Sequence, residues 1–338
     1  MEEAADTAQV NFEIVDLYSL DRETALIDTP YGGVSVTLQG DKGDPAILTY
    51  HDIGLNHCSN FGTFLGSKSM EALADKFCWY HINAPGQEFG AEKLPVDFSY
   101  PTMTQLAEQI EYIMDYYQLA HFIGLGVGAG ANVLARYAML NPERVSGLIL
   151  INLEPQAMSW THPAWLSGKA VQWQLKGREI GIPRLAAIHL KHHAFGSISG
   201  ALDGDLVRSY MEELSVQQPN NLALLMDSYH KRSSITGDFI KLMECPCLFV
   251  VSGSFTHKET LVKLCSLLPQ GKATYLEISN TSGLLLEEQP ARLAIALQLF
   301  LQGLGLVPAL STHHTCPSLH TSMVLEGISA PLYPIAAS

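Results

Sequence analysis

Apolar and polar residues alternate along several short stretches of the chain, and continuous apolar runs fill others. In residues 32–40, "GGVSVTLQG", Val34, Val36 and Leu38 alternate with polar residues, as they do in a half-buried β-strand. Other segments are more continuously apolar, which is typical of strands that are covered on both faces. Further strands are predicted at 45–54, 77–86, 245–253 and 273–283.

Helical patterns lie between these strands. Residues 101–117 carry one apolar stripe, and Thr102 with Gln105 forms a capping-box signature at its start. The stripe consists of Leu106, Ile110, Ile113 and Tyr117. Residues 121–152 read as strand, turn, helix and strand, and a last amphipathic helix is predicted from about residue 288 to 301. This alternation predicts an α/β fold with a mostly parallel sheet that has helices on both faces.

The composition changes along the chain and suggests four regions. Residues 1–28 contain eight acidic residues and one arginine, so we expect an acidic, flexible arm at 1–27. Residues 28–305 are expected to form one domain, in which 155–244 lose the strand rhythm and form a helical cap insertion over the sheet. Residues 306–338 are rich in Ser, Thr, His and Pro, and they are expected to be a flexible tail.

The turn at Gly128 has the form of a nucleophile elbow. In α/β-hydrolases, G-x-S-x-G lies on a sharp strand-to-helix turn that exposes the serine. Here the frame is Gly126-Val127-Gly128-Ala129-Gly130, so the nucleophile position is vacant. Glycine tolerates the positive φ that such a turn needs, and it supplies no hydroxyl. The frame predicts the geometry of the elbow without its chemistry.

The two partners of a catalytic triad are also missing from their expected places. The loop after the strand at 245–253 holds Ser254, Phe255 and Thr256, so the acid position falls at Phe255. The loop before the last helix has Gly283 where the base is expected. Without a base and an orienting acid, an alcohol is a poor nucleophile at neutral pH. Hydrolysis by this mechanism is therefore not expected.

The turn has two other interpretations. Gly126, Gly128 and Ala131 fit G-x-G-x-x-A, with Glu154 as a ribose-binding acid, but several strands precede this turn, whereas the dinucleotide fingerprint normally opens its fold. Alternatively, the small residues serve only to pack the following helix closely on the sheet. This packing role is compatible with each of the functional interpretations. No cofactor is predicted.

Composition limits the class of partner and the compartment. The net charge of −14 argues against nucleic-acid binding by general electrostatics. No apolar run is long enough to predict a transmembrane segment. The first residues lack a basic region followed by an apolar one, so a secretory signal is not expected. Six scattered cysteines do not suggest a disulfide scaffold. A cytoplasmic location is predicted.

Several sequence blocks, taken in order, resemble the N-myc downstream-regulated (NDRG) family. They are "HDIGLNH" (51–57), "APGQEFGA" (84–91), "YPTMTQLAE" (100–108), "GLGVGAGANVL" (124–134), "NPERVSGLILIN" (141–152) and "NLALLMDSYHKR" (221–232). The resemblance covers roughly residues 28–305. It implies an α/β-hydrolase fold without the triad, a pseudoenzyme. It also implies a cytoplasmic role in signal transduction, stress response and the control of growth or differentiation through protein partners.

Alternative functions remain open in the sequence. The spare nucleophiles of a rewired hydrolase are Ser252, Ser254 and Cys58, and each has a simpler reading as a strand-end or loop residue. A small-anion pocket would use His51, Asp52, Ala129 and Gly130, because Ala129 and the loop after the second predicted strand supply oxyanion-hole amides in active hydrolases. Capping and pairing within a closed loop is the preferred reading of His51 and Asp52. No metal site is predicted at His192, His193 or His230, since adjacent helical side chains diverge.

Overall fold

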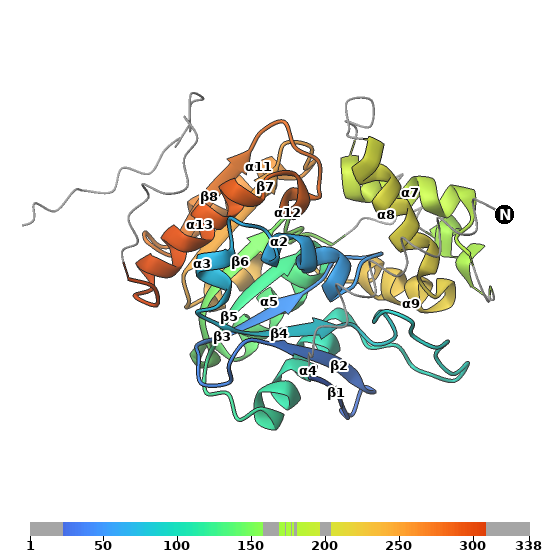
Figure 1. Cartoon of the computed structure of the whole chain (residues 1–338), viewed down its shortest axis with the longest axis horizontal. Helices are drawn as coiled ribbons and strands as arrows, with labels where there is room; N and C mark the ends of the chain where they lie inside the picture. Colours follow the sequence, from blue (N-terminus) through green and yellow to red (C-terminus); the bar gives the residue numbers. More distant parts are fainter. Residues whose placement is uncertain are drawn as a thin grey trace, which may run out of the picture.

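The computed structural model describes residues 23–157, 169–172, 174–176, 178, 181–196 and 204–308. An eight-stranded sheet, in the order β1-β2-β4-β3-β5-β6-β7-β8, forms the centre of the molecule (Figure 1). β1 pairs antiparallel with β2, and β2 with β4, whereas every other pairing is parallel. The strands are β1 Thr24–Ile27, β2 Val34–Gln39, β3 Ala46–Tyr50, β4 Cys78–Asn83, β5 Phe122–Val127, β6 Val145–Ile151, β7 Cys247–Ser252 and β8 Ala273–Ile278.

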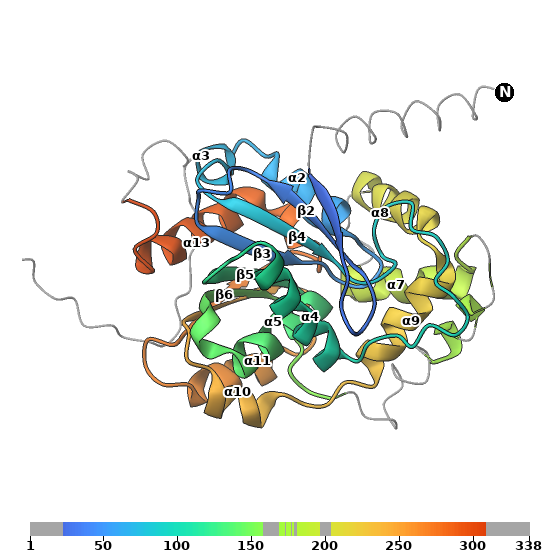
Figure 2. The same cartoon turned by 90° about the horizontal axis from the view of Figure 1, so that it is seen from below.

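Helices cover both faces of the sheet, so its central strands are buried throughout. On one face pack α4 (Met103–Tyr116), α5 (Ala129–Leu140), α10 (Thr236–Leu242) and α11 (Lys258–Leu267). On the other face pack α2 (Thr63–Leu65), α3 (Glu71–Ala74), α12 (Leu285–Glu288) and α13 (Pro290–Gly303). Figure 2 shows these two layers on opposite sides of the strands. A short π-helix, η1 (Cys58–Gly62), and a short 3₁₀-helix, η2 (Pro142–Arg144), complete the elements outside the cap.

The cap includes α7 (Arg184–Phe195), α8 (Gly204–Val216) and α9 (Pro219–His230). It lies to one side of the sheet in Figure 1, beyond the carboxyl ends of the parallel strands. The ring of Phe195 meets that of Tyr210 edge-on at 5.3 Å between centroids, which joins α7 to α8. Asn221 on α9 accepts the Leu94 N–H and donates to the carbonyl of Gly86, which joins the cap to the loop after β4.

The α/β class, the mostly parallel sheet and the helices on both faces confirm the fold predicted from the sequence. The capping box at the start of α4 is also present: the Thr102 hydroxyl accepts the Gln105 N–H, and the Gln105 side chain accepts the Thr102 N–H. The sheet begins with β1 at Thr24–Ile27, a few residues before the domain start expected at residue 28. Most of the expected acidic arm and tail lie outside the described residues.

Candidate functional site

The turn between β5 and α5 lies at the carboxyl end of the sheet and depends on close backbone packing. Gly128 has φ 51° and ψ −110°, a conformation that favours glycine. A Cβ at Gly126 would lie 2.6 Å from the backbone of Ala131, and a Cβ at Gly130 would overlap the carbonyl oxygen of Tyr50. The small residues therefore bring α5 against the sheet, as the structural interpretation of this turn expected.

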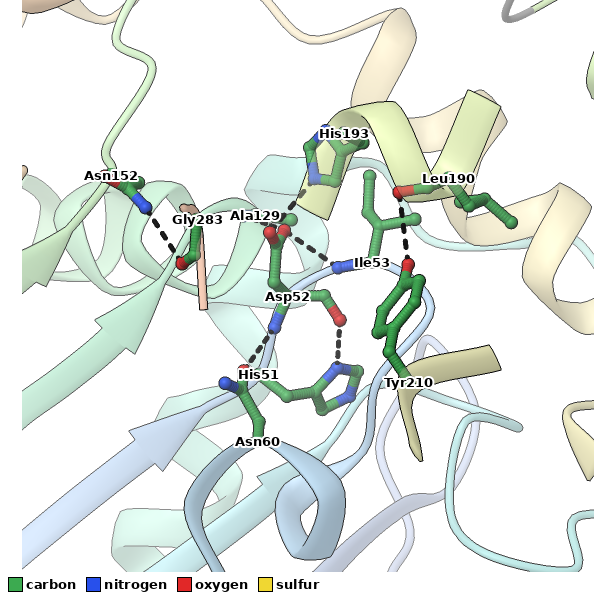
Figure 3. A network of polar contacts seen from close by, with 10 residues as sticks. All are labelled: His51, Asp52, Ile53, Asn60, Ala129, Asn152, Leu190, His193, Tyr210 and Gly283. Atoms are coloured by element: carbon green, nitrogen blue, oxygen red, sulfur yellow. Dashed lines mark hydrogen bonds and ion pairs between the residues drawn. The ribbon is translucent and has the colours of Figure 1, made fainter. Parts of the chain in front are cut away.

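The carboxylate of Asp52 lies directly over this turn (Figure 3). Its Oδ1 accepts hydrogen bonds from the Ala129 N–H at 2.9 Å and from the Ile53 N–H at 2.8 Å. A Cβ at Gly128 would overlap the same carboxylate. In α/β-hydrolases, the amide after the nucleophile and an amide of the loop after the third strand form the oxyanion hole. An internal carboxylate thus occupies the corresponding pair of amides here.

The second oxygen of Asp52 contacts the cap. Nε2 of His193, in the last turn of α7, lies 3.0 Å from Asp52 Oδ2. Burial alone would lower the pKa of His193, but the charge of Asp52 and its hydrogen bond raise that pKa above the ordinary value. Burial opposes ionisation of Asp52 in the same way, but His193 and the two backbone N–H groups lower the Asp52 pKa. We conclude that the two side chains form an ion pair.

His51 faces away from the Asp52 carboxylate. Its Nε2 accepts the Ala84 N–H at 3.0 Å, so Nδ1 carries the proton and donates to the Asp52 carbonyl at 2.8 Å. The ring is buried, and this burial lowers the His51 pKa to about 4. His51 is therefore a neutral residue that fixes the loop. Of the residues considered for an anion pocket, the structure brings Asp52 and Ala129 into contact and turns His51 toward Ala84.

The loop after β7 contains Phe255, the residue that the sequence places at the acid position. Ser252 donates its N–H to Asn152 Oδ1 at 2.9 Å, and its hydroxyl lies 3.4 Å from that of Ser254. Within the described residues, neither hydroxyl has a hydrogen bond to a histidine. The Phe255 side chain packs, partly buried, against the core under the cap. These serines therefore lack the geometry of an activated nucleophile in the part of the chain that the structure covers.

Gly283 lies in the loop after β8, where the sequence placed the base position. Its carbonyl accepts the Asn152 side-chain N–H at 3.2 Å. A Cβ at Gly283 would overlap the carbonyl oxygen of Ala194, because the backbone of α7 passes directly over this loop. The last turn of α7 thus contacts the Gly128 turn through Asp52 and the Gly283 loop through its backbone.

Glu154, the candidate ribose-binding acid, has one oxygen in a hydrogen bond and the other near a histidine, without a hydrogen bond of its own. Oε1 accepts the Gln156 N–H at 3.0 Å, and Oε2 lies 3.0 Å from His257 Nδ1. The histidines weighed as metal ligands are at separate places: His193 pairs with Asp52, and His230 ends α9. In the residues that the structure describes, no three His, Cys, Asp or Glu side chains gather as metal ligands would.

Sequence reasoning missed two contacts at this end of the sheet. It treated His193 only as a metal candidate, and it assigned Cys58 to a loop. In the structure, Cys58 begins η1, and its Sγ lies 3.0 Å from Nε2 of His57. For Cys58 the available signal was its position next to His57 in the loop region after β3, whereas the position of His193 within α7 gave no such signal. No described helix has the length and apolar character needed to cross a membrane.

Comparison with known proteins places this chain among relatives of similar length. The model of the Ndr family matches residues 24–308. Protein NDRG4-B of Xenopus laevis is 35% identical over 295 residues, which are 84% of this chain and 77% of that protein. Protein NDRG2 of Homo sapiens is 35% identical over 312 residues, covering 90% of this chain and 79% of that protein.

Solved structures with a similar fold are hydrolases of low sequence identity. A thermophilic esterase from Thermogutta terrifontis (malate bound) matches with a TM-score of 0.68 and 18% identity, covering 84% of this chain and 99% of that one. Carboxylesterase CesB (YbfK) from Bacillus subtilis matches with a TM-score of 0.65 and 18% identity, covering 90% of this chain and 99% of that one. These matches establish the α/β-hydrolase fold alone.

Proposed function

The chain belongs to the Ndr family, and from that membership we propose that it is a non-enzymatic protein which acts through its surface. The proposal extends to a cytoplasmic protein that takes part in signal transduction, stress response and the control of growth or differentiation by binding protein partners. The resemblance of the sequence to the NDRG family supports these roles. The geometry of the Gly128 turn supports the absence of hydrolysis.

The occupied amide pair is the observation that carries the non-enzymatic part of the proposal. An oxyanion hole accelerates acyl transfer because its N–H groups are free to stabilise a developing negative charge. Here the Ala129 and Ile53 N–H groups already donate to Asp52. A substrate oxyanion at that position would meet a fixed carboxylate instead, and like charges at such distances repel. The site therefore opposes the transition state that its fold relatives stabilise.

The triad positions add to this proposal. Gly128 offers no side chain, Phe255 offers no carboxylate, and Gly283 has no room for a side chain beneath the backbone of α7. A relocated serine would still need a base, and the hydroxyls of Ser252 and Ser254 bond to each other. We expect neither serine to react as an activated nucleophile.

Labelling with a fluorophosphonate probe tests the non-enzymatic proposal. The purified full chain should show no labelling above that of a Ser252→Ala, Ser254→Ala double variant, and no hydrolysis of p-nitrophenyl esters above background. Robust labelling that one Ser→Ala change abolishes would overturn the proposal. For the partner-binding role, a pull-down from native tissue should recover partners with the full chain and lose them when the cap is deleted.

A small-anion sensor would require Asp52 to leave the Ala129 and Ile53 amides. No contact in the described residues favours that movement, because His193 holds the other oxygen of the same carboxylate. A thermal-shift screen with phosphate and small carboxylates measures directly whether such anions bind and stabilise the protein. Stabilisation that depends on anion concentration and disappears in an Ala129→Pro variant, which lacks the N–H, would support the sensor instead.

A further inference from the structure

His57, Cys58 and Asn83 form a polar cluster that has no part in the Asp52 site. His57 directly precedes η1, Cys58 is the first residue of η1, and Asn83 is the last residue of β4, the parallel neighbour of β3. Cys58 Sγ is 3.0 Å from His57 Nε2. The other ring nitrogen, Nδ1, lies 3.1 Å from Asn83 Oδ1. The sulfur, the imidazole and the amide therefore form a chain of three polar groups.

The Asn83 amide fixes the orientation of the imidazole. Its Oδ1 accepts the backbone N–H of His57 at 2.8 Å, and because that N–H can only donate, the oxygen must face His57. When Nδ1 carries the proton and donates to the same oxygen, the Nε2 lone pair points at the sulfur and can accept the thiol proton. Asn83 Nδ2 also lies 3.0 Å from Nδ1, so the amide can serve either tautomer.

Packing restricts the ring further. His57 stacks on His81 with 5.5 Å between ring centroids and an interplanar angle of 22°. His81 is itself stacked on Trp79 and held by Thr49 at 2.7 Å. An imidazole that cannot turn away keeps Nε2 beside the sulfur. This combination of a thiol, an adjacent base and a group that orients the base is the arrangement that activates cysteine nucleophiles.

Other cysteines of the described chain lie in different environments. Burial raises the pKa of Cys265 to about 12 and raises that of Cys78. Cys245 and Cys247 contact each other, and Cys247 donates to the Cys245 carbonyl. Among the cysteines of the described residues, Cys58 is the one with a histidine nitrogen at hydrogen-bonding distance.

We propose that Cys58 is a reactive thiol that small hydroperoxides modify, with His57 as its base and Asn83 as the residue that orients this base. His57 takes the thiol proton, and the thiolate attacks one oxygen of the hydroperoxide. An S–O bond forms and the O–O bond breaks, so that the sulfur is oxidised to a sulfenic acid and the peroxide is reduced. The departing alkoxide or hydroxide takes the proton from His57 and leaves as an alcohol or water.

Limited access defines the class of reagent. Cys58 is 7% exposed, so hydrogen peroxide and small alkyl hydroperoxides fit the site better than glutathione or a protein disulfide. This oxidation site goes beyond the non-enzymatic function proposed above and does not rest on it. Oxidation of Cys58 would let hydroperoxides modify a protein that acts through its surface, at the same end of the sheet as the cap.

The pH dependence of alkylation tests the base. Iodoacetamide is applied to the full reduced chain between pH 5.5 and 9.5, and the rate at each cysteine is followed by mass spectrometry. The alkylation of Cys58 should be half-maximal below about pH 7.5, because an adjacent histidine favours the thiolate. Limited access slows the reaction at every pH and leaves this midpoint unchanged. In a His57→Gln variant the midpoint should move above about pH 8, and the rate at pH 6.5 should fall about fivefold.

Dimedone trapping after brief treatment with hydrogen peroxide tests the oxidation itself. Cys58 should carry more sulfenic acid than Cys78 or Cys265, and a Cys58→Ser variant should lose that signal. A midpoint above pH 8 in the wild-type chain, an unchanged profile in His57→Gln, or no sulfenic acid at Cys58 would each overturn the proposal. Should His57→Gln fail to fold, the wild-type midpoint and the trapping result decide the matter.

Discussion

His193 Nε2 lies 3.0 Å from Asp52 Oδ2, and this contact joins the cap helix α7 to the amide pair at the Gly128 turn. The other carboxylate oxygen accepts the Ala129 and Ile53 N–H groups, so one residue links the cap, the loop after β3 and the start of α5. The side chains are 32% and 16% exposed, respectively. Because the His193 side chain is partly open to solvent, the pair should contribute about as much as a well-oriented ion pair at the surface.

The Asp52–His193 pair should make the stability of the protein depend on pH. The folded-state pKa of His193 is raised, so its contribution is full below the unfolded pKa of about 6.5 and is lost as pH rises through the folded value. The folded-state pKa of Asp52 is lowered, so its contribution is present above about pH 4 and is lost in acid. Since His193 is partly exposed, a His193→Gln variant should lose about 1 kcal/mol or less at pH 6 and much less at pH 8.5.

Thermal unfolding followed by circular dichroism from pH 5 to 8.5 measures this difference. The melting temperature of the wild type should fall more steeply above pH 6.5 than that of His193→Gln. His192→Gln is the matched control, because His192 occupies the same last turn of α7 and its mutation leaves the Asp52 pair intact. Parallel curves for the wild type and His193→Gln would show that the pair has no role in stability.

Gly128 and Asp52 should be energetically coupled. An added Cβ at Gly128 overlaps the Asp52 carboxylate and also strains a residue with φ 51°, so Gly128→Ala should cost about 2 to 4 kcal/mol. In an Asp52→Ala background the overlap disappears and only the backbone strain remains. The cost of Gly128→Ala should therefore fall by at least about 1 kcal/mol, measured by urea unfolding in a double-mutant cycle.

Gly130→Ala provides the control for this cycle. Its Cβ would overlap the backbone carbonyl of Tyr50, which removal of the Asp52 side chain does not move. Its cost should be the same in both backgrounds. Additive effects for Gly128→Ala and Asp52→Ala would mean that the carboxylate does not fill the space above the turn.

The sequence predicted the sheet and its helices because each central strand is a distinct apolar run and each long helix carries its own periodicity. β3 and β5 are buried at every position, as their composition suggested, and Leu106, Ile110 and Ile113 face the core. β1 was missed because it has only four residues, and its burial does not alternate cleanly. An edge strand of that length depends on pairing with β2 rather than on a pattern of its own.

The candidate site was predictable only in part, because its contacts join residues far apart in the chain. The frame around Gly128 indicated a turn without a nucleophile. It could not indicate that the Asp52 carboxylate fills the space that the missing side chain leaves. His193 lies 141 residues away from Asp52, and their contact depends on how the cap docks. Cap docking follows from tertiary packing, which local periodicity does not report.

Gly283 should be needed for cap docking. Its added Cβ overlaps the backbone carbonyl of Ala194, which cannot rotate away as a side chain can. Gly283→Ala should therefore displace α7, cost about 2 kcal/mol, and speed proteolysis within the cap. Gly237→Ala on α10 is the control, since its Cβ meets nothing within 4 Å and alanine favours the helix. Equal stability and equal proteolysis of Gly283→Ala and the wild type would contradict this account.

Asn152 connects the end of β7 to the loop after β8 by hydrogen bonds, and these should depend on its side-chain amide. Its Oδ1 accepts the Ser252 N–H at 2.9 Å, and its Nδ2 donates to the Gly283 carbonyl at 3.2 Å. Asn152→Asp keeps the shape but turns a carboxylate oxygen toward that carbonyl, so it should cost about 1 to 3 kcal/mol at pH 7.5 in urea unfolding. At pH 5 the cost should be smaller, since a protonated carboxyl can donate to the Gly283 carbonyl.

Asn280→Asp is the control, because Asn280 is exposed and also has positive φ. This change should alter stability by less than about 0.5 kcal/mol at either pH. An Asn152→Asp cost that is as small as this control, or that does not change with pH, would mean that the amide does not hold the two loops.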